Sequence, residues 1–130
     1  MKLQPDKADT QVITGYGPGW VSVGFFVEGQ PQQQKVEHSI VIGSQGERLD
    51  WPSISFDQLK AEHFEQLAAF KPELVIFGSG SKLRFPSPTH QRALMQARIG
   101  LETMDTLAAC RTYNILAGEG RHVLAVLLAD

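Results

Sequence analysis

The heptapeptide LVIFGSG, residues 74–80, decides the fold class of this 130-residue chain. Its first four residues are continuously apolar, which is typical of a strand covered on both faces in the middle of a sheet. A helix is expected from Ser87-Pro88 to about Arg98, because serine favours the N-cap and proline the first helical position. Gly100 would follow its end, and a second short strand is expected at 101–104. One helix therefore joins two short strands, which predicts a right-handed parallel βαβ pair.

The sequence on either side of this unit completes the order β-β-β-α-β-α-β-α-β. The pattern predicts strands at 11–16, 20–27 and 36–42, a polar turn or loose loop at 29–34, a helix from Ser55 or Asp57 to about residue 70 with Gln58 closing a capping box, a helix that starts at Asp105 or Thr106, and a last strand at 121–128. We therefore predict an α/β protein with antiparallel strands in its first half, a mixed central sheet and about three helices. Residues 1–130 are expected to form a single domain, with 1–10 as a loose N-terminal tail.

Composition narrows the class of protein. The net charge is −2 and the isoelectric point about 6.1, so no basic surplus is present to bind the phosphates of a nucleic acid. The single cysteine, Cys110, excludes an intramolecular disulfide and favours a reducing compartment. The longest apolar run, 123–129, is too short to span a bilayer, and the N-terminal residues carry no targeting pattern. These features predict a cytoplasmic protein without membrane insertion.

The segment 102–121, ETMDTLAACRTYNILAGEGR, places several polar residues on a helix of mostly small residues. Arg111 and Asn114 fall on the same stripe of that helix, and Asp105 and Glu119 bracket it. A small-residue helix packs close to its sheet, so charges beside the contact would be partly desolvated and would need partners. We therefore expect Arg111 to pair with one of three carboxylates, those of Glu102, Asp105 and Glu119. Whether the cluster also serves a ligand is left open.

A binding crevice is predicted where the two parallel strands end. Ligands of open α/β sheets sit beyond the carboxyl ends of the strands, which here are the Gly78–Lys82 loop and the Asp105–Thr106 helix start. Backbone amides of the glycine loop and of the helix N-terminus would attract an anion. The alternative is that the glycines only permit a tight turn. The candidate binding residues are Gly78, Ser79, Gly80, Ser81, Lys82, Glu102, Asp105, Thr106, Arg111, Asn114, Glu119 and Arg121.

The sequence lacks three well-known motifs of cofactor-binding and catalytic sites. The Gly78-x-Gly80 pair follows a strand, but Leu83 stands where a dinucleotide-binding fingerprint needs glycine, and the spacing of a P-loop is missing too. No Gly-x-Ser-x-Gly nucleophile elbow occurs. The four histidines are scattered without a close pair, which argues against a metal site. We therefore expect no cofactor or metal and assign no catalytic residue.

Four segments together resemble a known family. Trp51, VIFGSG at 75–80, ETMDTLAACRTYN at 102–114 and EGR at 119–121 look like the Mth938-like family of domains of unknown function, and the resemblance covers roughly residues 10 to 128. It implies a three-layer β+α/β/α fold with a mixed central sheet. It also implies that bacterial members lack an assigned activity, while relatives include the mitochondrial complex I assembly factor 3, which acts through protein contacts.

Two functions follow from these observations. The first is a non-catalytic accessory or assembly factor whose partner is another protein, and it predicts an exposed apolar patch. The alternative is a small-molecule-binding protein or enzyme that uses the crevice between Gly78–Lys82 and Asp105–Thr106. In that case Glu102 or Asp105 would be the acid–base group, and Arg111 or Lys82 would hold an anion. Self-association through an edge strand is left open.

Overall fold

The computed structural model describes residues 10–130, so the expected N-terminal tail lies outside the described residues apart from Thr10. The elements are β1 (Val12–Gly17), β2 (Trp20–Val27), β3 (Gln30–Val36), β4 (Ser39–Gly43), β5 (Arg48–Trp51), a 3₁₀ turn η1 (Phe56–Gln58), α2 (Ala61–Ala69), β6 (Leu74–Gly78), α3 (Pro88–Gln96), β7 (Gly100–Met104), α4 (Thr106–Gly118) and β8 (Val123–Leu127). The strands form two sheets. The three-stranded sheet has the order β1-β2-β3, and the five-stranded sheet has the order β5-β4-β8-β6-β7.

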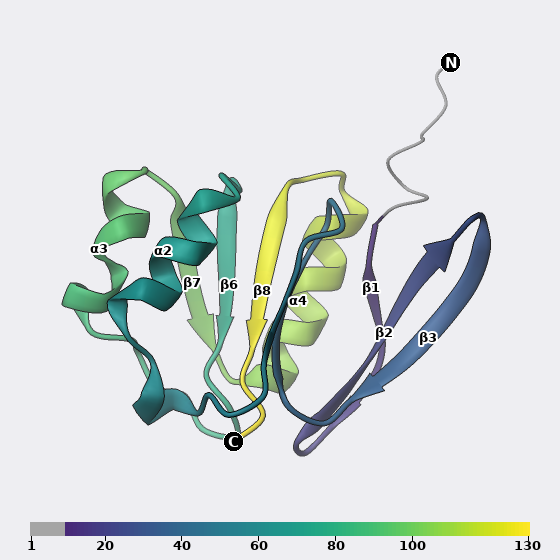
Figure 1. The fold of residues 1–130 in the computed structure, drawn as a ribbon, viewed down its shortest axis with the longest axis horizontal. Coiled ribbons are helices and arrows are strands. Elements are labelled where there is room, and N and C mark those ends of the chain that lie inside the picture. The colour runs from purple at the N-terminus through teal and green to yellow at the C-terminus, as the bar shows by residue number, and fades with distance from the viewer. Residues whose placement is uncertain (1–9) are drawn as a thin grey trace.

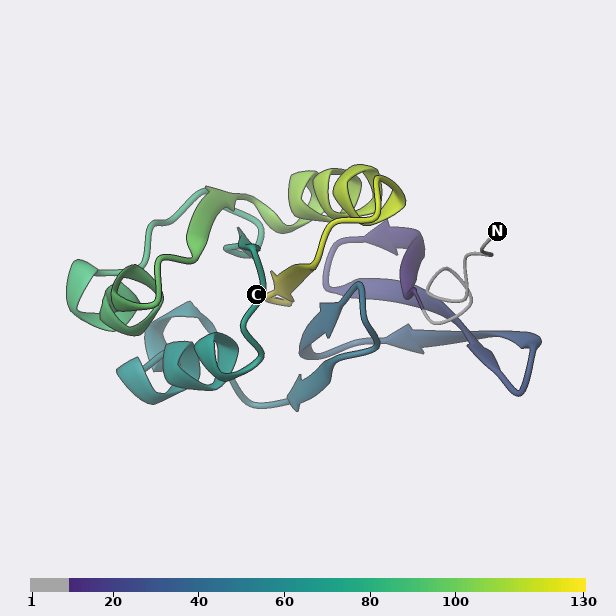
Figure 2. The ribbon, with the colours of Figure 1, turned by 90° about the horizontal axis from the view of Figure 1, so that it is seen from above.

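The five-stranded sheet lies in the middle of three layers (Figures 1 and 2). Helices α2 and α3 cover one of its faces, while α4 and the three-stranded sheet lie on the other. Two apolar clusters fill the spaces between the layers. One joins the five-stranded sheet to α4 and the three-stranded sheet, and the other joins it to α2 and α3. Strand β4 supplies both clusters, because Ile40 and Ile42 face the first and Val41 faces the second. This is the β+α/β/α arrangement expected from the family resemblance.

Three parallel strands end at the same edge of the central sheet. Strand β6 pairs in parallel with β7 on one side and with β8 on the other, which confirms the predicted βαβ pair and adds a third strand to it. All five residues of β6 and all five of β8 are buried, as their continuous apolar character predicts. Strand β4 runs antiparallel to β8, so the sheet is mixed.

The glutamine-rich segment after β2 is a strand and not the expected loop. Residues 30–36 pair with 27–21 along their whole length. The connecting turn consists of Glu28 (φ 51°) and Gly29 (φ 81°), the two positive φ values that suit a tight hairpin. All residues of β3 except Val36 are exposed, because this strand forms one edge of its sheet. The polar character of residues 30–36 therefore reflects their exposure to solvent and does not indicate a loop.

The expected strand 36–42 and the expected helix 55–70 are each divided in two. The chain leaves β3 at Val36 and joins the other sheet only at Ser39, so 36–42 serves two sheets. Gln58 accepts a hydrogen bond from the Ser55 backbone N–H (2.9 Å), but this contact closes the 3₁₀ turn η1. Helix α2 starts later, at Ala61. The short strand β5 has no counterpart in the sequence-based prediction.

The helix caps of the second half agree better with the prediction. The Ser87 hydroxyl accepts a hydrogen bond from the backbone N–H of His90 (3.2 Å), and Asp105 Oδ1 accepts one from that of Ala108 (2.9 Å). The predicted C′ glycine of α3 is wrong. Arg98, with φ at 59°, takes the left-handed conformation there, and Gly100 instead opens β7.

Candidate functional site

The loop after β6 and the start of α4 lie against each other, as the crevice prediction requires. The Gly80 N–H donates to Thr106 Oγ1 (2.8 Å), and the Thr106 N–H donates to the Gly80 carbonyl oxygen (2.9 Å). The Thr106 hydroxyl in turn donates to the carbonyl oxygen of Leu128, just beyond β8 (2.8 Å). These three bonds join the carboxyl ends of β6 and β8 to the segment that follows β7.

A cavity of about 330 Å³ opens at this edge of the sheet. Its walls come from the β1–β2 turn, the start of α4, the loop after β6 and the segment after β8. The lining residues are Gly17, Pro18, Gly19, Trp20, Val21, His38, Gly80, Ser81, Asp105, Thr106, Leu107, Leu127, Leu128, Ala129 and Asp130. The cavity is mostly apolar and has a few polar groups at its rim, as small-molecule sites commonly do.

Four of the twelve candidate residues line this cavity, namely Gly80, Ser81, Asp105 and Thr106. The other eight do not: Gly78, Ser79, Lys82, Glu102, Arg111, Asn114, Glu119 and Arg121. The acidic groups of the lining are Asp105 and Asp130, His38 contributes an imidazole, and no lysine or arginine is among the lining residues. The helix N-terminus is also engaged by its own cap at Asp105. This lining does not favour an anion.

His38 is held in place by Asp50. Its Nε2 lies 2.8 Å from Asp50 Oδ1, and Arg48 Nη2 lies 3.0 Å from the same oxygen. Two hydrogen bonds lower the pKa of the Asp50 carboxyl below its usual value. The bond with Arg48 has the larger effect and the bond with His38 the smaller one. A carboxylate that stays ionised orients the imidazole at the cavity rim.

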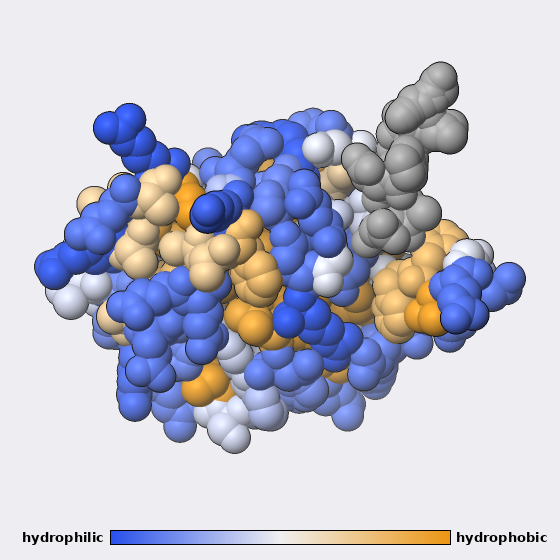
Figure 3. All heavy atoms as spheres, turned by 45° about the horizontal axis from the view of Figure 1, so that its top comes forward, coloured by the Kyte–Doolittle hydropathy of each residue, from blue (hydrophilic) through white to orange (hydrophobic). Residues whose placement is uncertain are grey.

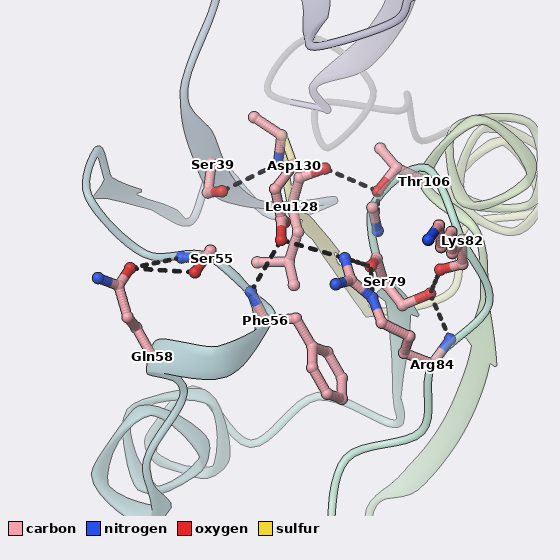
Figure 4. A network of polar contacts seen from close by, with 12 residues as sticks. Ser39, Ser55, Phe56, Gln58, Ser79, Lys82, Arg84, Thr106, Leu128 and Asp130 are labelled. Atoms are coloured by element: carbon pink, nitrogen blue, oxygen red, sulfur yellow. Dashed lines mark hydrogen bonds and ion pairs between the residues drawn. The ribbon is translucent and has the colours of Figure 1, made fainter.

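The Gly-Ser-Gly loop is fixed from within the protein (Figure 4). The fully buried Ser79 hydroxyl donates to the Lys82 carbonyl oxygen (2.6 Å) and accepts from the Arg84 backbone N–H (3.0 Å). The Arg84 guanidinium donates to the Ser79 carbonyl oxygen (2.7 Å) and to Asp130 Oδ2 (3.1 Å), and it lies 4.8 Å from the centre of the Phe56 ring. These contacts satisfy the loop without a ligand.

The expected ion pair of Arg111 is wrong. Arg111 is exposed, and its Nη1 donates to the Tyr16 hydroxyl (3.2 Å) across from β1. Its carbon Cζ lies 6.0 Å from the Tyr16 ring centre. This hydrogen bond to the Tyr16 hydroxyl oxygen is the main cause that raises the pKa of Arg111. The prediction failed because the side chain lies in water at the rim of α4, where a charge needs no buried partner.

Asn114 and Tyr113 attach β1 to α4. The Asn114 side chain accepts from the Ile13 N–H and donates to the Ile13 carbonyl oxygen, both at 2.8 Å. It therefore pairs with β1 as a neighbouring strand would. The buried Tyr113 hydroxyl donates to the Gln11 carbonyl oxygen (2.7 Å), and burial raises the pKa of this phenol. The polar groups of this helix face hold the three-stranded sheet in place.

The remaining candidates lie apart from the cavity. Glu119 and Arg121 follow the far end of α4, where Arg121 Nε pairs with Glu73 Oε1 (3.1 Å). Glu102 is exposed on the edge strand β7, and Lys82 is exposed in its loop. Sequence reasoning assembled these residues by their closeness in the chain, but the two ends of a 13-residue helix are about 20 Å apart.

The cavity residues that sequence reasoning missed come from the antiparallel half and from the last residues. Trp20, His38 and the Pro18 turn line it, and so does Asp130. The sequence signal for this wall was the turn Gly17-Pro-Gly-Trp20, which ends in a tryptophan. No local sequence pattern indicates which edge of the central sheet this turn approaches.

Residues 10–130 contain neither a cluster of metal ligands nor an exposed thiol. Within this range no three metal-ligating side chains of the His, Cys, Asp or Glu type come together. Cys110 is fully buried, and burial raises the pKa of its thiol to about 12. None of the described helices is long and apolar enough to cross a bilayer.

Comparison with known proteins yields relatives along nearly the whole chain. A Bordetella pertussis protein described as a Mth938-like domain has a TM-score of 0.76 and 29% identity, over 100% of this chain and 93% of that one. The Bos taurus NADH dehydrogenase [ubiquinone] 1 alpha subcomplex assembly factor 3 is 33% identical over 82 residues, which is 62% of this chain and 45% of the relative. The Francisella tularensis 13 kDa major membrane protein is 29% identical over 70 residues, 54% of this chain and 57% of the relative. The chain thus spans about half the length of these two curated relatives.

The model of one protein family, described as a protein of unknown function (DUF498/DUF598), matches residues 13–128. The matched range runs from β1 to just past β8 and so includes both sheets, α4 and the cavity. With the Mth938-like fold and this match together, the chain belongs to the DUF498/DUF598 family of Mth938-like proteins.

Proposed function

We propose that this protein is a non-catalytic accessory factor that binds another protein during the assembly of a membrane-associated complex. The names of two relatives support this proposal, since one is an assembly factor of NADH dehydrogenase and the other a major membrane protein. Of the polar residues of α4 that suggested chemistry, Asn114 is occupied with backbone contacts, and its neighbour Tyr113 makes one as well. A surface that recognises a protein is then the feature to look for.

The observation that carries the proposal is an exposed apolar surface on the β2–β3 hairpin. Phe26 is 48% exposed and Val27 is 50% exposed, close to the turn of the hairpin. Figure 3 shows this apolar area at the right-hand end of the molecule. Beside it lies a hollow of about 390 Å³, lined by Val12, Phe25, Phe26 and Pro31 among others. Aromatic side chains of this kind are common anchors of protein interfaces.

The backbone beside this surface offers a second means of binding. Within residues 10–130, strand β3 pairs in its sheet with β2 alone, so its other edge offers peptide groups to an extended partner segment. Its Pro31 and its five exposed polar residues limit uncontrolled pairing along that edge. We therefore place the partner on the hairpin, with Phe26 as the apolar anchor.

The location we propose is the cytoplasm, and the partner we propose is a protein and not a nucleic acid. The single cysteine is a buried thiol, in keeping with a reducing compartment. The net charge of −2 does not favour binding to phosphates.

Replacing Phe26 and Val27 with serine should prevent complex assembly without unfolding the protein. Both side chains are about half exposed, so the fold loses little packing. In cells that lack the protein, the wild type should restore the assembled membrane complex on native gels, and the double variant should not. Ile115→Ser is the matched control, because Ile115 is a similarly exposed apolar residue on α4. Full restoration by the hairpin variant would contradict the proposal.

The cavity favours a second candidate function, the binding of a small molecule. It lies at the carboxyl ends of the three parallel strands and is lined by Trp20, His38 and Asp105. In a thermal-shift screen with small metabolites, a true ligand should raise the unfolding midpoint of the wild type. The same ligand should raise the unfolding midpoint of the Asp105→Asn variant by less, because asparagine still caps the helix but lacks the negative charge. A screen in which no compound moves the wild-type midpoint would remove this candidate.

A further inference from the structure

The charges of this protein are segregated along the chain. Residues 74–101 contain four cationic side chains, Lys82, Arg84, Arg92 and Arg98, and no aspartate or glutamate. The rest of the chain holds eight cationic and all fourteen acidic side chains. A protein with a net charge of −2 therefore has one segment that is uniformly positive.

Large apolar side chains stand out from the same segment. Leu83 is 56% exposed and Phe85 is 67% exposed in the loop after β6, and Met95 is 64% exposed on α3. The loop presents them because its intervening residue points inward, where Arg84 binds the Ser79 carbonyl oxygen and Asp130. The apolar side chains are thus displayed on a fixed backbone.

Helix α3 continues this surface. Arg92 and Met95 lie on one side of it, together with Pro88, Thr89 and Gln96, around a shallow hollow. Arg98 is exposed just beyond its end. Helix α2, which packs against α3, carries the exposed acidic residues Glu62 and Glu65 and so bounds the positive region.

We propose that this basic loop–α3 surface, formed by Lys82, Leu83, Phe85, Arg92, Met95 and Arg98, docks on a membrane of anionic phospholipids. Cations that flank exposed apolar side chains match a negatively charged headgroup layer above an acyl interior. The leucine and phenylalanine project from a loop and are more than half exposed, a shape that suits insertion between lipids better than a fit into a folded partner.

The basic loop–α3 surface is separate from the β2–β3 hairpin. In Figure 1, α3 lies at the left-hand end of the molecule and the β2–β3 hairpin at the right-hand end. A protein held on a membrane by one end would present the other end to a protein partner. The inference goes beyond the proposed function and does not depend on it, because lipid binding is measured without the protein partner.

Co-sedimentation with phospholipid vesicles tests the proposal. The 130-residue chain should sediment with vesicles of phosphatidylcholine mixed with phosphatidylglycerol and stay in solution with phosphatidylcholine alone. Raising the salt concentration to about 0.5 M should release it, since surface charges are then screened. Arg92→Glu should weaken binding about 25-fold, because each unit of charge near the surface contributes on the order of a factor of five and the reversal changes the charge by two units. Leu83→Ser/Phe85→Ser should weaken it by about tenfold or more.

Two matched variants control for net charge and for apolar surface elsewhere. Lys35→Glu makes the same charge change on β3, and Ile115→Ser removes an exposed apolar side chain from α4. Both should bind vesicles as the wild type does. Thermal unfolding of each variant should stay within a few degrees of the wild type, since all the replaced side chains are exposed.

Three results would overturn the proposal. The first is equal binding to neutral and anionic vesicles, or to neither. The second is a soluble poly-glutamate peptide that binds the same surface more tightly than the vesicles do, which would assign the surface to an acidic protein segment. The third is a dimer, seen by sedimentation velocity, that Leu83→Ser/Phe85→Ser dissociates, which would assign it to a second copy of the chain.

Discussion

Asn114→Ala should destabilise the protein by about 3 kcal/mol, because two partly buried backbone groups each lose a hydrogen bond worth on the order of 1 to 3 kcal/mol when left unpaired. Those groups are the N–H and carbonyl of Ile13, both 2.8 Å from the Asn114 side chain. Urea unfolding followed by the fluorescence of Trp20 and Trp51 measures the loss. Hydrogen exchange at the Ile13 amide should also become faster in the variant.

Arg111→Ala is the matched control for this prediction. Arg111 lies one turn earlier on α4 and faces the same strand, but it is exposed, and it donates to the Tyr16 hydroxyl instead of to backbone groups of β1. The urea midpoint of the Arg111→Ala protein should equal that of the wild type within error. If Arg111→Ala and Asn114→Ala destabilise the protein equally, the assignment of Asn114 as the link between β1 and α4 is wrong.

Gly78→Ala should be equally damaging, at about 3 kcal/mol, since it overpacks a close contact. An added Cβ would lie 2.9 Å from Ala109 Cβ, 2.9 Å from the Val126 carbonyl oxygen and 3.0 Å from Thr106 Cα. None of these is the end of a flexible side chain, so the backbone of α4 or of β8 has to move. The displacement should break the Gly80–Thr106 hydrogen bonds and open the cavity edge.

Gly118→Ala separates this effect from the general consequences of replacing glycine. A Cβ at this last position of α4 meets nothing within 4 Å. The variant should be neutral or more stable by up to about 1 kcal/mol, as alanine favours helix over glycine. The same urea titration compares both variants. A Gly78→Ala protein as stable as Gly118→Ala would contradict the close approach of α4 to β6.

The parallel part of the fold could be predicted because its signals are local. Four apolar residues from Leu74, a capped helix at Ser87 and a second cap at Asp105 fix the strand–helix–strand order. Crossover connections between parallel strands are almost always right-handed, and this rule predicts the handedness of the βαβ unit. The glutamine-rich β3 was missed because an exposed edge strand needs no apolar pattern, and the turn at Glu28-Gly29 contains only one glycine.

The candidate site was predictable only in part, for a related reason. Gly80 and Thr106 meet because both follow neighbouring parallel strands, which sequence order reveals. Trp20 and His38 reach the same cavity through the packing of a second sheet, which no local pattern encodes. Arg111 was assigned a buried partner because helical periodicity gives the face of a residue but not whether that face ends in solvent.

Photocrosslinking in living cells tests the central claim most directly, namely that this protein acts by contact through its β2–β3 hairpin. A photoreactive amino acid at position 26 should give a discrete adduct with a single protein that belongs to a membrane-associated complex. The same amino acid at position 115, an even more exposed site on α4, should give none. No adduct at position 26, or the same adducts at both positions, would contradict the account.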